Sequence, residues 1–121
     1  MLYGKGDQGR VTCEDIEAIL ASHTDEHMVK PAMVYLSDAT ELGTYYTYDQ
    51  LKAISDLCHE KGLYLFLDGA RLGNALCAQH NDLKLSDLPK LCDVFYIGGT
   101  KNGALFGEAL VIVNDQLKPD F

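Results

Sequence analysis

The sequence has 121 residues, of which 47% are hydrophobic, and its net charge at pH 7 is −8. A chain of this size suffices for one domain with a hydrophobic core, and its acidity argues against a nucleic acid or a membrane surface as a partner, because both attract basic patches. No apolar run is long enough to span a membrane, and the first residues lack the apolar core of a secretory signal. We therefore expect a cytoplasmic protein.

Two helices carry start signals in the sequence. Thr12 is a typical N-cap for a helix over residues 13–22, which has apolar side chains at helical spacing. Thr47 and Gln50 form a capping-box pattern at the start of a second helix, and Gly62 is a typical residue at its C-terminal end. We expect both helices to bury one apolar stripe.

Four apolar runs predict strands, over residues 33–37, 63–67, 94–97 and 108–113. The second and third runs do not alternate with polar residues, so we expect them to be buried on both faces. The first run, the helix after it and the second run form a right-handed βαβ unit. Only about ten residues separate the last two runs, which is too short for a helical crossover, so the fourth strand is expected to be antiparallel.

Shorter helical segments lie between the second and third strands. One is expected after Arg71, through Leu76 to Gln79, and another is bracketed by Leu83 and Leu91, with Ser86 as its cap. The sequence therefore predicts an α/β protein with three mainly parallel strands, an antiparallel fourth strand and flanking helices.

Neither the cysteines nor the histidines predict a metal site. The four cysteines, at positions 13, 58, 77 and 92, have irregular gaps and no C-x-x-C pair, and the last three are expected to be small buried hydrophobes. His23 and His27 have a spacing that could chelate a metal from one helix face. Their polar surroundings and the nearby Pro31 favour a solvated loop instead.

Charged residues follow two of the predicted buried strands, where an open α/β sheet holds its chemistry. Lys101 comes after Gly98 and Gly99, and a lysine that is partly desolvated there has a lowered pKa and reacts with carbonyls. The alternative is a surface lysine after a glycine turn. Asp68 ends an apolar strand and needs a charged partner, either Arg71 or a cationic ring nitrogen of a cofactor.

Two motifs resemble one family of enzymes. Leu-Asp-Gly-Ala-Arg-Leu-Gly-Asn-Ala at 67–75 and Phe-Tyr-Ile-Gly-Gly-Thr-Lys at 95–101 are similar, in this order and spacing, to the threonine aldolase and β-eliminating lyase family. Residues 9–18 and 33–53 extend the resemblance, which is greatest for the low-specificity L-threonine aldolases. It implies a partial large domain of the aspartate-aminotransferase type (fold type I), with residues 1–121 as its central part and the N-terminal part and C-terminal small domain absent. It also implies pyridoxal 5′-phosphate as cofactor.

The resemblance assigns roles to five residues. Lys101 would hold the cofactor as a Schiff base, and Asp68 would pair with the pyridine nitrogen and keep the ring an electron sink. Ala70 would pack on the ring face and Thr100 would hydrogen-bond the phosphate. Arg71 would bind the carboxylate of the amino-acid substrate with its planar fork. The implied reaction is the reversible cleavage of L-threonine or L-allo-threonine to glycine and acetaldehyde.

The sequence departs from the family pattern in two ways. Thr40-Glu41 stands where many members have a Thr-His pair, so either Glu41 or another group must act as the base, and the base stays unassigned. The family enzymes are also much longer than this chain. They form homo-oligomers, and we expect the parent protein to form a homo-oligomer too. Two alternatives remain at this point, namely β-elimination from an amino acid on the same scaffold and a catalytically inactive fragment.

Overall fold

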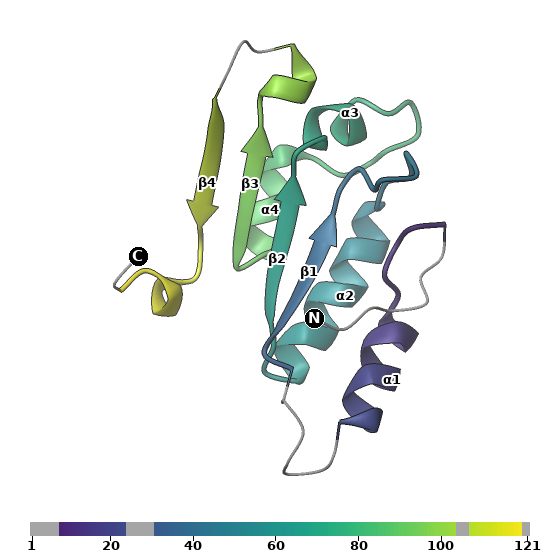
Figure 1. Ribbon diagram of the computed structural model, residues 1–121, viewed down its shortest axis with the longest axis vertical. Coiled ribbons are helices and arrows are strands. Elements are labelled where there is room, and N and C mark those ends of the chain that lie inside the picture. The colour runs from purple at the N-terminus through teal and green to yellow at the C-terminus, as the bar shows by residue number, and fades with distance from the viewer. Residues whose placement is uncertain (1–7, 24–30, 104–106, 120–121) are drawn as a thin grey trace.

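The computed structural model describes residues 8–23, 31–103 and 107–119, which form one mixed sheet flanked by helices (Figure 1). The strands are β1 (Met33–Ser37), β2 (Tyr64–Gly69), β3 (Val94–Gly98) and β4 (Glu108–Ile112). The α-helices are α1 (Cys13–Ser22), α2 (Tyr48–Glu60), α3 (Leu72–Leu76) and α4 (Leu88–Leu91). Short 3-10 helices are η1 (Leu85–Asp87), η2 (Thr100–Asn102) and η3 (Asp115–Leu117).

The sheet has the order β1-β2-β3-β4. The first three strands are parallel, and β4 runs antiparallel to β3, with Tyr96 opposite Leu110. The predicted βαβ unit and the antiparallel fourth strand are therefore confirmed. As a result, the carboxyl ends of β1, β2 and β3 meet at one edge of the sheet, which is the upper edge in Figure 1.

Local sequence sets the helix ends as predicted. The Thr12 side chain accepts a hydrogen bond from the Asp15 amide while the Asp15 carboxylate accepts one from the Thr12 amide, which completes a capping box on α1. Thr47 and Gln50 make the same reciprocal pair on α2. After α2 the chain turns at Gly62, whose φ of +70° lies in the left-handed region that glycine adopts without strain.

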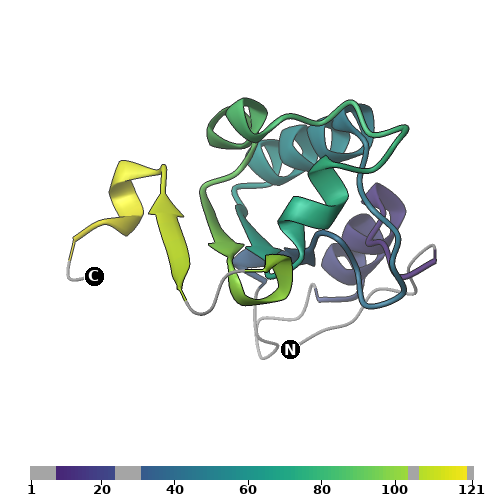
Figure 2. The same ribbon diagram turned by 90° about the horizontal axis from the view of Figure 1, so that it is seen from above.

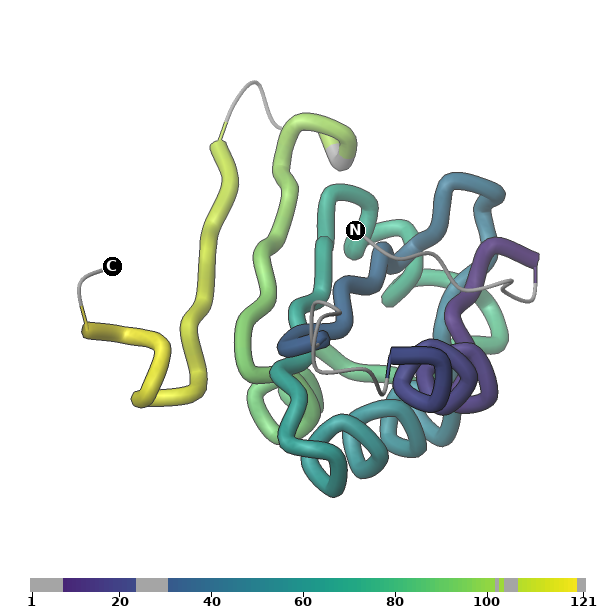
Figure 3. Tube along the Cα trace, turned by 60° about the horizontal axis from the view of Figure 1, so that its bottom comes forward, coloured from purple at the N-terminus to yellow at the C-terminus, as the bar shows by residue number. Residues whose placement is uncertain are grey.

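The core lies between one face of the sheet and the helices. Helices α2 and α4 cover this face, and α1 packs beside α2 (Figures 2 and 3). Leu36, Leu65 and Phe95, from the first three strands, are almost fully buried against α2, whose stripe is formed by Leu51, Ile54, Leu57 and Cys58. Full burial of one such leucine side chain stabilises the fold by about 2 kcal/mol.

The prediction that β2 and β3 are buried on both faces is wrong for β2 and for the second half of β3, although Val94 and Phe95 at the start of β3 are both buried. Burial along β2 alternates, with Leu65, Leu67 and Gly69 buried and the residues between them half-buried. The second face of the sheet carries an aromatic row, in which Tyr35 stacks on Phe66 and Phe66 meets Tyr96 edge-on. The apolar residues of these strands therefore form two different faces, one aliphatic and buried, the other aromatic and partly exposed.

Three smaller expectations are corrected. Cys77 is exposed because it follows the end of α3, whereas Cys58 and Cys92 are buried as predicted. The helix after Arg71 ends at Leu76 and does not reach Gln79. Ser86 lies inside η1 and is not a cap, because the Asp87 carboxylate accepts the hydrogen bond from the Lys84 amide.

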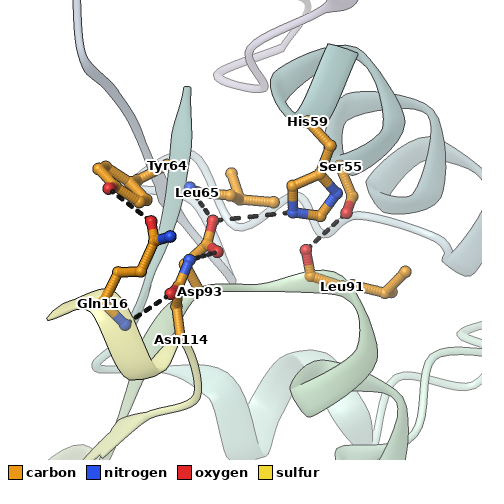
Figure 4. A network of polar contacts seen from close by, with 8 residues as sticks. All are labelled: Ser55, His59, Tyr64, Leu65, Leu91, Asp93, Asn114 and Gln116. Atoms are coloured by element: carbon orange, nitrogen blue, oxygen red, sulfur yellow. Dashed lines mark hydrogen bonds and ion pairs between the residues drawn. The ribbon is translucent and has the colours of Figure 1, made fainter. Parts of the chain in front are cut away.

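Buried Asp93 ties three strands together at the edge of the sheet opposite the carboxyl ends (Figure 4). One carboxylate oxygen accepts from the Leu65 amide (2.8 Å), and the other accepts from the Asn114 side chain (2.9 Å). Its backbone carbonyl also accepts from the amides of Val113 and Asn114. Because a buried carboxylate must have its hydrogen bonds satisfied, this network fixes where β4 leaves the sheet.

Within residues 8–23, 31–103 and 107–119, no helix is both long and apolar enough to cross a membrane, and no group of three or more His, Cys, Asp or Glu side chains could hold a metal ion. His23 follows α1, but His27 lies outside the described residues.

Candidate functional site

The predicted site residues gather at the carboxyl edge of the sheet because β2 and β3 are adjacent and parallel. Asp68 is the penultimate residue of β2 and pairs in register with Tyr96 of β3. Beyond Tyr96, β3 ends at Gly98, and η2 then carries Thr100 and Lys101. The Asp68 and Lys101 regions, 33 positions apart in the sequence, are thus brought to neighbouring strand ends.

Two glycines allow the backbones to approach closely at this edge. A Cβ atom on Gly69 would lie 1.9 Å from the carbonyl oxygen of Tyr96, and one on Gly98 would lie 2.7 Å from the Cα atom of Ala70. Neither neighbour is a flexible side chain, so only glycine fits at these positions. The close approach places Ala70 directly against the end of β3.

Three donors surround the carboxylate of Asp68. The Tyr35 hydroxyl donates to Oδ2, the Ala70 amide donates to Oδ1 (3.0 Å), and the Tyr96 hydroxyl also donates to the carboxylate. Partial burial by itself would raise the pKa of Asp68, but the three hydrogen bonds and the positive charge of Lys101 outweigh it and lower the pKa. Asp68 is therefore an anion at neutral pH.

Arg71 does not pair with Asp68, so this interpretation of the sequence is not confirmed. Its Nη1 atom lies 3.0 Å from Oε1 of Glu41 and forms an ion pair with it. The structure thus brings the predicted substrate-binding arginine and the candidate base together. With the Glu41 side chain 76% exposed, the pair contributes little to stability.

A tight loop presents Glu41. The amide of Thr40 donates to the carbonyl of Thr44 (2.8 Å), the amide of Gly43 donates to the carbonyl of Thr40, and the hydroxyls of Thr40 and Thr44 share a hydrogen bond of 2.6 Å. Thr40 itself is buried. The loop is therefore held at its base while Glu41 points outward.

Lys101 and Thr100 are exposed on η2, and Ala70 is half-buried beside Asp68. The partial desolvation expected around the Lys101 amino group is therefore not present in the described chain. Its charge nevertheless reaches the Asp68 carboxylate, whose pKa it helps to lower. An exposed amine remains accessible to a carbonyl compound that enters from solvent.

Sequence reasoning missed Asp38, which directly follows β1 and so has a place similar to that of Asp68, the penultimate residue of β2. The Asp38 side chain is fully buried, Oδ1 accepts from the Tyr46 amide at 3.3 Å, and Oδ2 has no hydrogen-bond partner among the residues described. Burial raises the pKa of Asp38 to about 6, although the Tyr46 hydrogen bond acts in the opposite direction. The signal was an acid directly after an apolar strand, the same pattern that drew attention to Asp68.

Tyr35 and Tyr96 were also missed as members of the site. Each stands within an apolar run, where a tyrosine is ordinarily part of the core. The parallel register of the strands carries the signal, because it places both on the same face as Asp68.

Comparison with known proteins identifies the family. A profile of the β-eliminating lyase family matches residues 2–118, which is nearly the whole chain. The chain belongs to the β-eliminating lyase family. Members of this family and the threonine aldolases use pyridoxal 5′-phosphate.

Among curated relatives, the low specificity L-threonine aldolases of Pseudomonas aeruginosa and of Pseudomonas sp. (strain NCIMB 10558) are each 40% identical to this chain. The alignments cover 100% of this chain but 35% of each relative, so the chain spans about a third of their length. A solved threonine aldolase of Leishmania major matches 93% of the chain with a TM-score of 0.91 and 55% identity, over 33% of its own length. A solved protein of Listeria monocytogenes, described as an L-allo-threonine aldolase, matches 84% of this chain and 26% of its own with a TM-score of 0.61 and 27% identity. The predicted partial fold type I architecture is therefore confirmed.

The residues at the carboxyl edge fit the family's cofactor. An ionised carboxylate has about four acceptor positions, and the three donors around Asp68 leave one for a cationic ring nitrogen. The anionic state of Asp68 is the one that such a nitrogen requires. Lys101, on the adjacent strand end, supplies an accessible primary amine.

Proposed function

We propose that this chain supplies the central part of the site of a pyridoxal-phosphate-dependent threonine aldolase. The observation that carries the proposal is the placement of an anionic Asp68 and of Lys101 at the neighbouring ends of β2 and β3, in a chain of this family. The relatives' names support L-threonine or L-allo-threonine as substrate, and cleavage would give glycine and acetaldehyde.

Each residue has a distinct task in this proposal. Lys101 binds the cofactor covalently through its amino group, Asp68 holds the protonated ring nitrogen, Ala70 contacts the ring face and Thr100 binds the phosphate. When bound, pyridoxal phosphate accepts the electron pair released as a bond at the substrate α-carbon breaks. Asp68 matters because a ring nitrogen held in its protonated form is the better electron acceptor.

Arg71 and Glu41 act on the substrate. The guanidinium of Arg71 binds the α-carboxylate with two parallel hydrogen bonds, and this anion competes with Glu41 for it. Once released from Arg71, Glu41 accepts the proton of the β-hydroxyl as the bond between Cα and Cβ breaks. The ion pair therefore links substrate binding to the availability of the base.

The proposal also concerns the longer protein. Because the curated relatives are about three times as long, we infer that residues 1–121 form the central part of a large domain, and that other segments complete the phosphate and substrate contacts. We further infer a cytoplasmic homo-oligomer without nucleic-acid or membrane partners, in line with the acidic charge of −8.

A β-elimination reaction is the second candidate, and the family's description favours it. The two reactions separate by product, since aldol cleavage releases glycine with an aldehyde, whereas elimination releases ammonia and a keto acid. A catalytically inactive 121-residue piece is the third reading, favoured by its coverage of only 35% of each curated relative.

The experiment is a product assay on the purified protein with pyridoxal 5′-phosphate and L-threonine. We expect equal amounts of glycine and acetaldehyde, and a larger KM with a smaller change in kcat for Arg71→Lys, because a lysine cannot form the two parallel bonds. Lys84→Ala, an exposed lysine away from the strand ends, is the control and should leave both constants unchanged. Ammonia and keto acid without glycine would identify the elimination reaction, and no product would refute activity of the 121-residue chain.

A further inference from the structure

Two tyrosines approach Asp68 from the strands on either side of it. Tyr96 of β3 is its direct partner in the register, and Tyr35 of β1 is the partner of Phe66, two residues earlier on the same face of β2. Both hydroxyls donate hydrogen bonds to the Asp68 carboxylate, that of Tyr35 to Oδ2. The contact therefore joins three strands at one carboxylate.

Phe66 fixes the two phenol rings. The Tyr35 ring is stacked on it with centroids 5.3 Å apart and planes within 16°, and the Tyr96 ring meets it at 63° with centroids 6.3 Å apart. Both geometries are favourable for aromatic pairs. The hydroxyls are thus held by rings packed within the sheet and not by flexible side chains.

We propose that Tyr35 and Tyr96 are positioning residues, which hold the Asp68 carboxylate so that its remaining acceptor position faces the cationic ring nitrogen of the cofactor. The inference rests on the proposed function and extends it to residues with no assigned role. A carboxylate on a strand end can rotate about its side-chain bonds, and hydrogen bonds from two sides remove that freedom. Hydrogen bonds to an anion are also stronger than those between neutral groups.

The charges around the two phenols support this arrangement. Partial burial, the hydrogen bond to Asp68 and the negative charges of Asp68 and Glu41 raise the pKa of Tyr35 to about 12. Burial, the same hydrogen bond, and the charges of Asp68, Tyr35 and Glu108 raise the pKa of Tyr96 as well. Both phenols therefore remain protonated donors throughout the neutral range.

The first test needs no cofactor. In Tyr35→Phe and Tyr96→Phe, which keep the ring contacts, the pKa of the Asp68 carboxyl followed by its 13C resonance should rise, and it should rise furthest in the double variant. Tyr64→Phe is the matched control, because Tyr64 lies on the same face of β2 and its hydroxyl bonds Gln116. An unchanged Asp68 pKa in the double variant would overturn the proposal.

A second measurement follows the ionisation of the two tyrosine hydroxyls instead of that of Asp68. The chain has seven tyrosines, and ultraviolet titration of phenolate formation counts how many ionise at each pH. In Asp68→Asn, two of them should ionise at lower pH than in the parent protein, because the carboxylate that held them protonated is gone. If none moves, the two hydroxyls do not contact Asp68 and the proposal fails.

The third measurement connects the contact to the cofactor. The double variant should bind pyridoxal 5′-phosphate on the order of tenfold more weakly than the parent, while Tyr64→Phe binds as the parent does. Equal affinity of the parent and the double variant would overturn the positioning role even if the Asp68 pKa had moved. Failure of the parent to bind at all would refute the proposed function itself, an outcome distinct from either of the others.

Discussion

Asp38 carries a carboxyl group with no exposed surface and one oxygen without a hydrogen-bond partner among the described residues. Burial raises its pKa from the usual 3.8 to about 6. The folded chain therefore holds this proton more tightly than the unfolded chain, and stability falls as the pH rises from about 4 to about 6. Above pH 6, ionised Asp38 destabilises the fold by about 3 kcal/mol.

Asp38→Asn should therefore stabilise the protein at neutral pH. The asparagine keeps an oxygen for the Tyr46 amide and has no charge, so we expect the free energy of unfolding in urea at pH 7.5 to rise by up to about 3 kcal/mol. At pH 3 and below, the gain should disappear, because the aspartate is then largely protonated in both states. A gain of the same size at both pH values would show that the carboxyl does not titrate as described.

At the residue scale, the candidate site residues could be predicted from the sequence, but most of their hydrogen-bond and ion-pair partners could not. The positions of Asp68, Arg71 and Lys101 after apolar runs were enough to place all three at one edge of the sheet. The partner of Arg71 could not be predicted, because Glu41 lies thirty positions away on another strand's loop and only the fold brings them together. Tyr35 and Tyr96 needed the strand register, which no local pattern contains.

At the element scale, the close approach of β2 and β3 depends on glycine. In Gly69→Ala the new methyl group would meet the Tyr96 carbonyl, and the two strands would have to move apart. We expect a loss of about 3 kcal/mol in the free energy of unfolding. Gly62→Ala is the comparison, because its φ of +70° is strained for alanine although its surroundings are open, and it should cost only about 1 kcal/mol. Equal losses would mean that the strands are not in close contact at Gly69.

The Asp93 network should set the stability of the opposite edge. Asp93→Ala removes the acceptor of the buried Leu65 amide and of the Asn114 side chain, so we expect a loss of about 2–3 kcal/mol and faster hydrogen exchange at the Leu65 amide. Asp93→Asn, which keeps one acceptor oxygen, should lose less. Unchanged exchange at Leu65 in the alanine variant would contradict the network.

Most elements could be predicted because their signals are local. The N-cap at Thr12 and the capping box at Thr47 predicted the helix starts, and the short connection before β4 predicted the strand direction. The exposure of the second sheet face could not be predicted, since Tyr and Phe have the same apolar pattern whether that face is covered or open. The end of α3 at Leu76 was equally hidden, because no residue there breaks the helical pattern.

At the scale of the whole molecule, the chain is a sheet with one face covered by helices and with its candidate site residues at one edge. Met33, Tyr35 and Leu110 are each about half exposed on the aromatic side, whereas the other side forms the core. Asp68 lies on the aromatic side of β2 together with Phe66, and Lys101 follows at the neighbouring end of β3. This arrangement agrees with a chain that spans about a third of its curated relatives.

The most direct test of the account is to locate the lysine that binds pyridoxal 5′-phosphate. The purified protein is mixed with the cofactor, and its absorbance is recorded before and after borohydride reduction. The reduced protein is then digested, and the masses of its peptides are measured by mass spectrometry. We predict that reduction fixes the cofactor on Lys101, and that Lys101→Ala abolishes the spectral band while Lys90→Ala, an exposed lysine on α4, retains it. Labelling spread evenly over the lysines, or a band that survives in Lys101→Ala, would contradict Lys101 as the anchor.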